Sequence, residues 1–226
     1  PVGCRRFSNS WSGALNMAPK RIKVWRVLCA ALLALPLMAL AADNTYRIAP
    51  TGQRACYGVS GNVMACVGRS GVLAGQDADY SSGPLHYRDN GDGTVSDLNT
   101  GLVWQQSLGE KVSWEEAKAG ARNLRLGNQS DWRLPTIKEL YSLMDFSGFS
   151  PMPGRQGKPF IDPAFDFRYG DTANGERPID VQVWSATEYG GKLMGHGASV
   201  FGVNFADGRI KGYPKRNLAN ERSSRT

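Results

Sequence analysis

The chain contains few histidines and few cysteines, and this scarcity argues against several kinds of active site. Its 226 residues include 2 histidines, His86 and His196, and 4 cysteines. A zinc centre or a His-based hydrolase needs such residues at set spacings, and no H-E-x-x-H, G-x-S-x-G or P-loop pattern occurs. No cysteine follows Cys66, which argues against a cysteine nucleophile. We therefore predict no catalytic residues, no metal centre and no cofactor.

The chain also lacks an apolar run long enough for a comfortable membrane span. The main run extends from Val27 to Ala41, whereas a spanning helix needs about 20 residues. A basic segment that starts at Met17 precedes this run, which ends in an A-x-A cleavage pattern. We therefore predict that residues 17–41 are a cleaved signal peptide and that the mature chain starts at Ala42.

This leader predicts a periplasmic, secreted or cell-surface location in a bacterium, with no membrane span left after cleavage. We predict that residues 1–16, which precede the leader, are upstream or cloning-derived and carry no fold or function. The whole chain has 27 Lys+Arg and 20 Asp+Glu, but six of the basic residues and none of the acidic ones precede Ala42. Subtracting 6 from 27 leaves 21 basic residues against 20 acidic ones. This balance argues against a nucleic-acid partner.

Two cysteines remain after the predicted cleavage, and their spacing indicates a hairpin. Cys56 and Cys66 are equidistant from Gly61, which lies in a Ser-Gly-Asn turn. An even pair in an exported chain favours a disulfide, and no histidine or third cysteine is near enough in sequence to favour a metal site. We predict that residues 42–84 form a disulfide hairpin and a linker, and that residues 85–226 form the main domain.

The stretch DWRLPTIKEL combines the end of an extended segment with the start of a helix. Pro135 disfavours helical backbone before it, and Thr136 with Glu139 forms a T-x-x-E capping box. We expect Trp132 to pack in the core. We expect Arg133 to be partly buried and to form an ion pair with Glu139 or Asp131. The alternative is that Arg133 binds a ligand.

Two helices and several short strands follow from the same patterns. Ser113 and Glu116 form a second capping box, and the apolar spacing after it predicts a helix that ends near Leu124. The helix after the T-x-x-E box should extend from about Ile137 to Asp145. The alternation of apolar residues and turn residues predicts strands at 94–97, 102–105, 181–185, 199–205 and 209–213. The predicted fold class is therefore α+β.

An acidic turn, DNGDGTVSD, offers a weak calcium candidate. Asp89, Asp92 and Asp97 carry the hard oxygen ligands that calcium prefers. Their spacing does not match the EF-hand loop, because glycines stand where that loop needs Asp or Asn. We therefore favour a turn whose glycines and asparagines supply positive φ angles.

Two long loops, 146–180 and 189–197, hold the residues that we consider for ligand binding. Trp184 lies beside these loops and is a candidate exposed stacking platform, although core packing is the usual place for tryptophan. Nearby basic and imidazole side chains are candidates for contacts with an acidic ligand, although each is also a normal solvated charge. These candidates are Arg155, Lys158, Lys192, His196 and Lys211.

The motifs occur in an order that resembles a known family. The order DNGDGTVSDLNTGLVWQ, SWEEA, DWRLPTIKEL, VWSAT and VNFADG resembles the C-terminal domain family of the Legionella collagen-like adhesin (Lcl), long catalogued as a bacterial domain of unknown function. The resemblance covers about Tyr87 to Tyr213. The RLPT-x-x-E helix start is also similar to that of formylglycine-generating-enzyme-like and C-type-lectin-like domains. The resemblance thus implies a C-type-lectin-like fold, with two helices packed on small twisted antiparallel sheets and ligands bound by the later loops.

The chain departs from this family at its end. The family usually finishes in a strand resembling YVRCVR, whereas this chain finishes in KRNLANERSSRT, so we expect the last strand to be lost or replaced. The collagen-like stalk of the namesake is absent, so its trimerisation does not carry over and the oligomeric state stays open.

These patterns favour an exported, non-catalytic binding or adhesion module that recognises glycans or another surface polymer. The first alternative is a structural subunit of an envelope or pilus assembly. The second is an oxidative enzyme of the formylglycine-generating type. That enzyme class depends on a redox cysteine pair near the end of the domain, and no cysteine follows Cys66.

Overall fold

The structure is a computed structural model of the chain, and it describes residues 3–6, 48–68, 70–80, 83–193, 197–215 and 224–225. The chain divides into two units, of which one comprises Pro1–Phe7 together with Arg47–Thr226 and the other comprises Ser8–Tyr46. All described residues belong to the first unit, so the predicted signal peptide at 17–41 lies outside them. In the described part, no helix combines the length and the apolar character that crossing a membrane requires.

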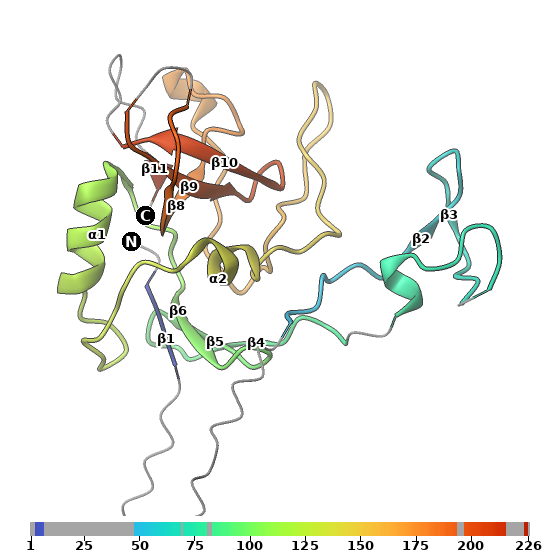
Figure 1. Cartoon of the computed structure of the whole chain (residues 1–226), viewed down its shortest axis with the longest axis horizontal. Coiled ribbons are helices and arrows are strands. Elements are labelled where there is room, and N and C mark those ends of the chain that lie inside the picture. Colours follow the sequence, from blue (N-terminus) through green and yellow to red (C-terminus); the bar gives the residue numbers. More distant parts are fainter. Residues whose placement is uncertain are drawn as a thin grey trace, which may run out of the picture. The chain divides into compact units, whose positions relative to one another are not determined.

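The first sheet has four antiparallel strands in the order β1-β6-β5-β4 (Figure 1). Its central strands β5 and β6 lie where the sequence predicts them, and both are almost fully buried. Tight turns that contain glycines at positive φ connect β4 to β5 and β5 to β6. The strands are β1 (Cys4–Arg6), β4 (Tyr87–Asp89), β5 (Thr94–Asp97) and β6 (Leu102–Gln105).

The second sheet has five strands in the order β10-β9-β8-β11-β7. All its pairs are antiparallel except β11 with β8. Gly202 in β9 is required by close packing, because a Cβ atom there would lie 2.8 Å from the carbonyl oxygen of Val183. The strands are β7 (Lys111–Val112), β8 (Gln182–Tyr189), β9 (Ser199–Asn204), β10 (Arg209–Pro214) and β11 (Ser224–Arg225).

A disulfide closes a small hairpin of β2 (Cys56–Tyr57) and β3 (Val63–Met64). The predicted bridge between Cys56 and Cys66 is confirmed, with the two Cα atoms 5.2 Å apart. The 3-10 helix η1 (Asp77–Asp79) packs beside it. The Asp79 carboxylate accepts hydrogen bonds from two loop amides, at 3.0 Å each, and so fixes the loop that follows the bridge.

Both predicted helices are present, and each begins with the predicted capping box. Helix α1 (Trp114–Asn123) begins after Ser113, and helix α2 (Ile137–Tyr141) begins after Thr136. Helix α2 ends four residues earlier than expected, because the chain then forms tighter turns in which Leu143 and Met144 donate to carbonyls three residues back. A 3-10 helix, η2 (Thr172–Asn174), interrupts the long loop before β8.

The predicted ion pair between Arg133 and Glu139 is confirmed, and it is bidentate. The guanidinium donates to both carboxylate oxygens, at 2.9 and 2.7 Å. The same carboxylate accepts from the backbone N–H of Thr136 at 2.8 Å. Burial alone raises the pKa of Glu139, but the hydrogen bonds from Arg133 and Thr136 outweigh it and hold the pKa at about 2.

An irregularity in β8 joins three sequence motifs. The β8–β9 register shifts between Trp184 and Glu188, and polar groups in this bulge face the helices. The carbonyl of Ser185 accepts from the Trp114 indole at 2.9 Å, and the N–H of Ala186 donates to the Pro135 carbonyl at 2.7 Å. The hydroxyl oxygen of Thr187 accepts a hydrogen bond from the first N–H of α2, also at 2.9 Å.

Two clusters of buried side chains form the core. The larger cluster surrounds α2, which lies between the two sheets in Figure 1, and it draws Trp104 from the first sheet and Phe205 from the end of β9. The smaller cluster lies between α1 and the second sheet, where Trp114 and Ala117 meet Trp184 and Val200. The class observed over the described residues is therefore α+β, with two α-helices and small, mainly antiparallel sheets.

One expectation about the chain's beginning is wrong. Residues 1–16 were expected to carry no fold, yet Cys4–Arg6 forms β1 and pairs antiparallel with β6. Cys4 has no solvent-exposed surface. The segment thus supplies the edge strand of the first sheet. Because β1 pairs with a strand that is distant in the sequence, no local sequence pattern predicts this strand.

We predict that Glu139→Gln destabilises the protein by about 1 to 2 kcal/mol, the size of a weakened cap plus a partly exposed ion pair. The folded-state pKa of Glu139 is about 2, against an ordinary value of 4.5. The stabilisation is therefore complete above the ordinary pKa and is lost as the pH falls toward about 2.

Thermal unfolding measured between neutral pH and pH 2 checks this. The melting temperature of the wild type should fall more steeply below pH 4.5 than that of the variant. Glu115→Gln is the matched control, because Glu115 is exposed in the first turn of α1. Identical acid profiles for wild type and Glu139→Gln would contradict the prediction.

Candidate functional site

A pocket of about 430 Å³ opens where the segment before β2 meets the chain after α2. Backbone hydrogen bonds fix this junction, because Phe146 donates to the carbonyl of Thr51 at 2.8 Å. The pocket is lined by residues 52–55, Tyr57, Leu85, Asp145, Ser147, Lys158 and Asp162. Segments that are far apart in the sequence therefore build one concave surface.

Asp145 organises the wall of this pocket. Its carboxylate accepts from the N–H of Ser147 at 2.9 Å and from the Ser147 hydroxyl at 2.6 Å. Its second oxygen lies 3.4 Å from the ammonium of Lys158, which also donates to Ser147. Since Asp145 is only 9% exposed, its partners compensate a largely buried charge.

The charges of the pocket are balanced. Arg54 and Lys158 contribute two positive charges, and Asp145 and Asp162 contribute two negative charges. Gln53 and Ser147 add uncharged hydrogen-bonding groups. Such a lining offers both donors and acceptors without a net charge, which suits a polar ligand rich in hydroxyl or amide groups.

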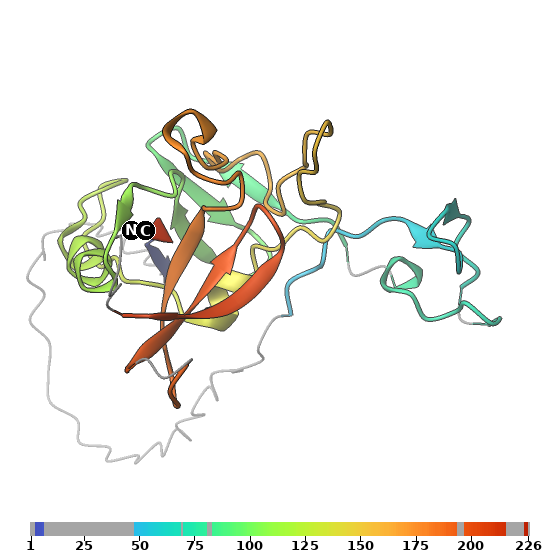
Figure 2. The same cartoon turned by 90° about the horizontal axis from the view of Figure 1, so that it is seen from above.

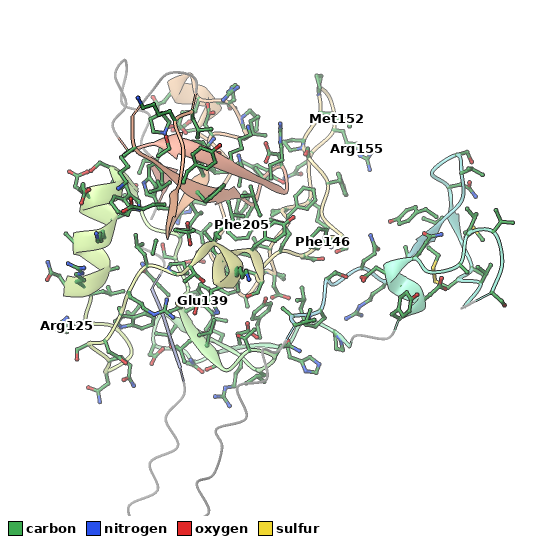
Figure 3. The ribbon with its side chains drawn as sticks, viewed as in Figure 1. Arg125, Glu139, Phe146, Met152, Arg155 and Phe205 are labelled. Carbon is green, nitrogen blue, oxygen red and sulfur yellow. A yellow bond between two sulfur atoms is a disulfide. The ribbon has the colours of Figure 1, made fainter. Side chains whose placement is uncertain are left out.

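A narrow hairpin rises from the rim of the pocket. Isolated bridges pair Phe149 with Lys158 and Met152 with Arg155, so both arms of the loop are hydrogen bonded to each other. In Figures 1 and 2 this loop, between α2 and β8, projects away from the sheets. Figure 3 shows Phe146 at its base, and Met152 and Arg155 on its outer part. The hairpin is thus an ordered projection next to a pocket.

The hairpin presents apolar side chains to solvent. Phe146, Phe149 and Met152 are 41%, 37% and 62% exposed. The guanidinium of Arg155 lies 4.4 Å from the centre of the Phe149 ring, a cation–π contact that holds both side chains. Tyr141 contacts the Phe146 ring edge to face. We name Phe146, Phe149, Met152 and Arg155 the hairpin patch.

The structure brings together only part of the predicted basic set. Lys158 lines the pocket, and Arg155 belongs to the hairpin patch. Lys192 is exposed in the loop after β8, and Lys211 is partly buried on β10, so each lies on a different element. His196 lies outside the described residues.

The idea that Trp184 is an exposed stacking platform is wrong. Its side chain is only 3% exposed and packs edge to face on Tyr213, with ring centres 5.9 Å apart. The indole N–H donates to the carbonyl of Val112 at 3.0 Å. Trp184 therefore belongs to the core cluster beside α1.

The three calcium candidates hold turns. The carboxylates of Asp89, Asp92 and Asp97 each accept from a backbone N–H two residues ahead, at 2.8 to 3.0 Å. Among the described residues, the grouping of potential metal ligands is Cys56, Cys66 and Asp79. The two cysteine sulfurs there are joined in a disulfide, so they are not thiolate ligands.

Sequence reasoning missed most of the pocket. It placed the ligand surface in the loop that follows residue 145, and it named Lys158, but it did not single out Asp145, Ser147 or Gln53. The Asp-x-Ser spacing of Asp145 and Ser147 is typical of a side chain that caps its own loop. That spacing was the available local signal for the pocket wall.

The sequence model described as the Lcl C-terminal domain matches residues 93–224, more than half of the chain. No curated protein and no solved structure matches the chain.

We predict that Asp145→Ala loosens the hairpin and costs about 1 to 3 kcal/mol, because it leaves partly buried donors unpaired. Amide hydrogen exchange should become faster at Ser147 and Phe149, while exchange in β5 stays slow. Asp166→Ala is the control, since Asp166 is exposed in the same long loop. Unchanged exchange at Ser147 in the Asp145 variant would show that the carboxylate does not hold the loop.

Proposed function

Because the chain belongs to the Lcl C-terminal domain family, we propose that it is an exported, non-catalytic adhesion module that binds a glycan or another surface polymer. Family membership fits an adhesion module. The observation that carries the proposal is the pairing of a polar pocket with the hairpin patch. Sugar-binding sites need both elements, because a sugar ring has hydroxyl edges and an apolar C–H face.

The balanced charge of the pocket favours a neutral or weakly charged glycan over a highly sulfated one. The positive charge of Lys158 is already compensated by Asp145. Lys215, another basic residue near the later loops, pairs with Glu188 at 2.9 Å. A polyanion would meet these carboxylates as well as the cations, which weakens its attraction.

The arrangement of helices and sheets supports a C-type-lectin-like fold as part of the same proposal. Two α-helices pack on small antiparallel sheets, and the long loop between α2 and β8 carries the hairpin patch and one wall of the pocket. The disulfide between Cys56 and Cys66 supports an extracytoplasmic location, since such bonds persist in oxidising compartments. This bond therefore supports a periplasmic, secreted or cell-surface location.

One feature favours the second candidate, a structural subunit of an envelope assembly. The disulfide hairpin and its loops expose Val59, Val63, Val67 and Val72, at 97%, 69%, 42% and 103%. Exposed apolar side chains of this kind suit a protein contact better than a sugar contact.

We predict binding to one or more neutral glycans on a glycan array, and retention of that binding at high salt, because the proposed contacts are hydrogen bonds and stacking rather than long-range charge attraction. Phe149→Ala should weaken binding about tenfold, which corresponds to about 1.4 kcal/mol. Asp145→Asn should also weaken it, since an amide donates where the carboxylate accepts.

The matched control is Val72→Ser, which changes an exposed apolar residue away from the pocket. It should leave glycan affinity unchanged. Binding that disappears at high salt and is insensitive to Phe149→Ala would count against the proposed site. No glycan binding, together with a stable co-purified complex that Val72→Ser disrupts, would favour the structural-subunit function instead.

A further inference from the structure

Strand β1 is the edge strand of the first sheet, and its free side also contacts the chain at Arg133. On one side it pairs with β6, where Cys4 faces Trp104 and the N–H of Gln105 donates to the Gly3 carbonyl at 3.1 Å. On the other side the N–H of Cys4 donates to the carbonyl of Arg133 at 3.2 Å. The segment therefore satisfies backbone groups of both neighbours.

The side-chain positions of this segment have strict size limits. A Cβ atom on Gly3 would lie 2.3 Å from the Trp132 ring, so only glycine fits without movement of the ring. Cys4 is completely buried in the larger core cluster, with its sulfur 3.9 Å from a Glu139 carboxylate oxygen. The space accepts a glycine followed by a small side chain, so it selects a sequence as well as a backbone shape.

Strand pairing and hydrogen bonds, rather than covalent bonds, hold β1 against the rest of the described fold. The chain connects Arg6 to Ile48 through the 41 residues from 7 to 47. A cut anywhere in that connection, including the expected one after Ala41, would break the covalent link to β1 and leave only non-covalent contacts to hold it, so that it could exchange. An extended segment bound in this way is a peptide ligand that adds a strand to a sheet.

We propose that the space between β6 and residues 132–134, which we name the strand slot, is a peptide-binding site. Its ligand is an extended segment with glycine followed by a small residue. In the intact chain β1 occupies the slot, and after a cut in the connection residues 3–6 from a second copy of the chain exchange with it in the slot. An empty slot would expose backbone groups of β6 and the buried face of Trp104, which favours refilling.

The test uses the full chain with Cys29→Ser and a site-specific protease sequence in place of residues 8–16. After cleavage, a fluorescent peptide of residues 1–8 is added and its anisotropy is followed. We expect the cut N-terminal fragment to remain with the protein through gel filtration and then to exchange with the labelled peptide. If cleavage unfolds the protein, excess peptide should restore the fold.

A second peptide tests the sequence requirement. It exchanges the order of Gly3 and Cys4, which keeps the composition but places a side chain against Trp132. We expect at least tenfold weaker binding. A peptide with Gly3→Ala should bind poorly to the wild type and regain affinity in Trp132→Ala, where the ring no longer blocks the Cβ atom. A merely structural role for Trp132 would not produce this rescue.

The proposal fails under any of three results. In the first, the fragment separates from a folded protein that takes up no peptide. In the second, cleavage unfolds the protein and excess peptide does not restore it. In the third, the exchanged-order peptide binds as tightly as the native one.

Discussion

The bulge in β8 is the constraint on which the rest of the fold depends. A regular strand would use its N–H and C=O groups only for its neighbours in the sheet. At Ser185 and Ala186 the shifted register releases these groups toward α1 and the start of α2. Both helices are thereby fixed to one short segment of one strand. Helix α2 has only five residues and would not be stable in isolation. Its hydrogen bonds to the β8 bulge supply the stability that so short a helix lacks.

The parts of the fold that local chemistry determines could be predicted from the sequence. Both capping boxes, the Arg133–Glu139 pair and the disulfide hairpin use residues that are close in sequence, and all are present. The full length of β8 was not predictable, because its second half pairs with β9 across the bulge. Strand β1 was missed for the same reason, since its partners β6 and Arg133 are about 100 residues or more away.

In the candidate site, too, the part formed by nearby residues could be predicted and the part formed by distant segments could not. The long loop after α2 was expected to carry the ligand surface, and Arg155 and Lys158 do lie beside the pocket or on its hairpin. The other wall comes from residues 52–55, about 90 residues earlier, which reach it through a backbone contact at Thr51. Trp184 shows the opposite error. Its position after an apolar strand does not say which face is covered, and α1 and β10 both pack near it.

Glu139 connects the helix start to the edge of the first sheet. Its carboxylate caps α2, holds Arg133 in place and lies beside the sulfur of Cys4. Burial, and next the charge of Glu139, raise the pKa of the Cys4 thiol to about 12, so it stays neutral and does not oppose the carboxylate. Because Arg133 also offers its backbone carbonyl to β1, the same two residues serve the helix cap and the strand slot. Binding of β1 in the slot holds Arg133, and formation of α2 holds Glu139, its ion-pair partner. Filling the slot and forming α2 should therefore stabilise each other.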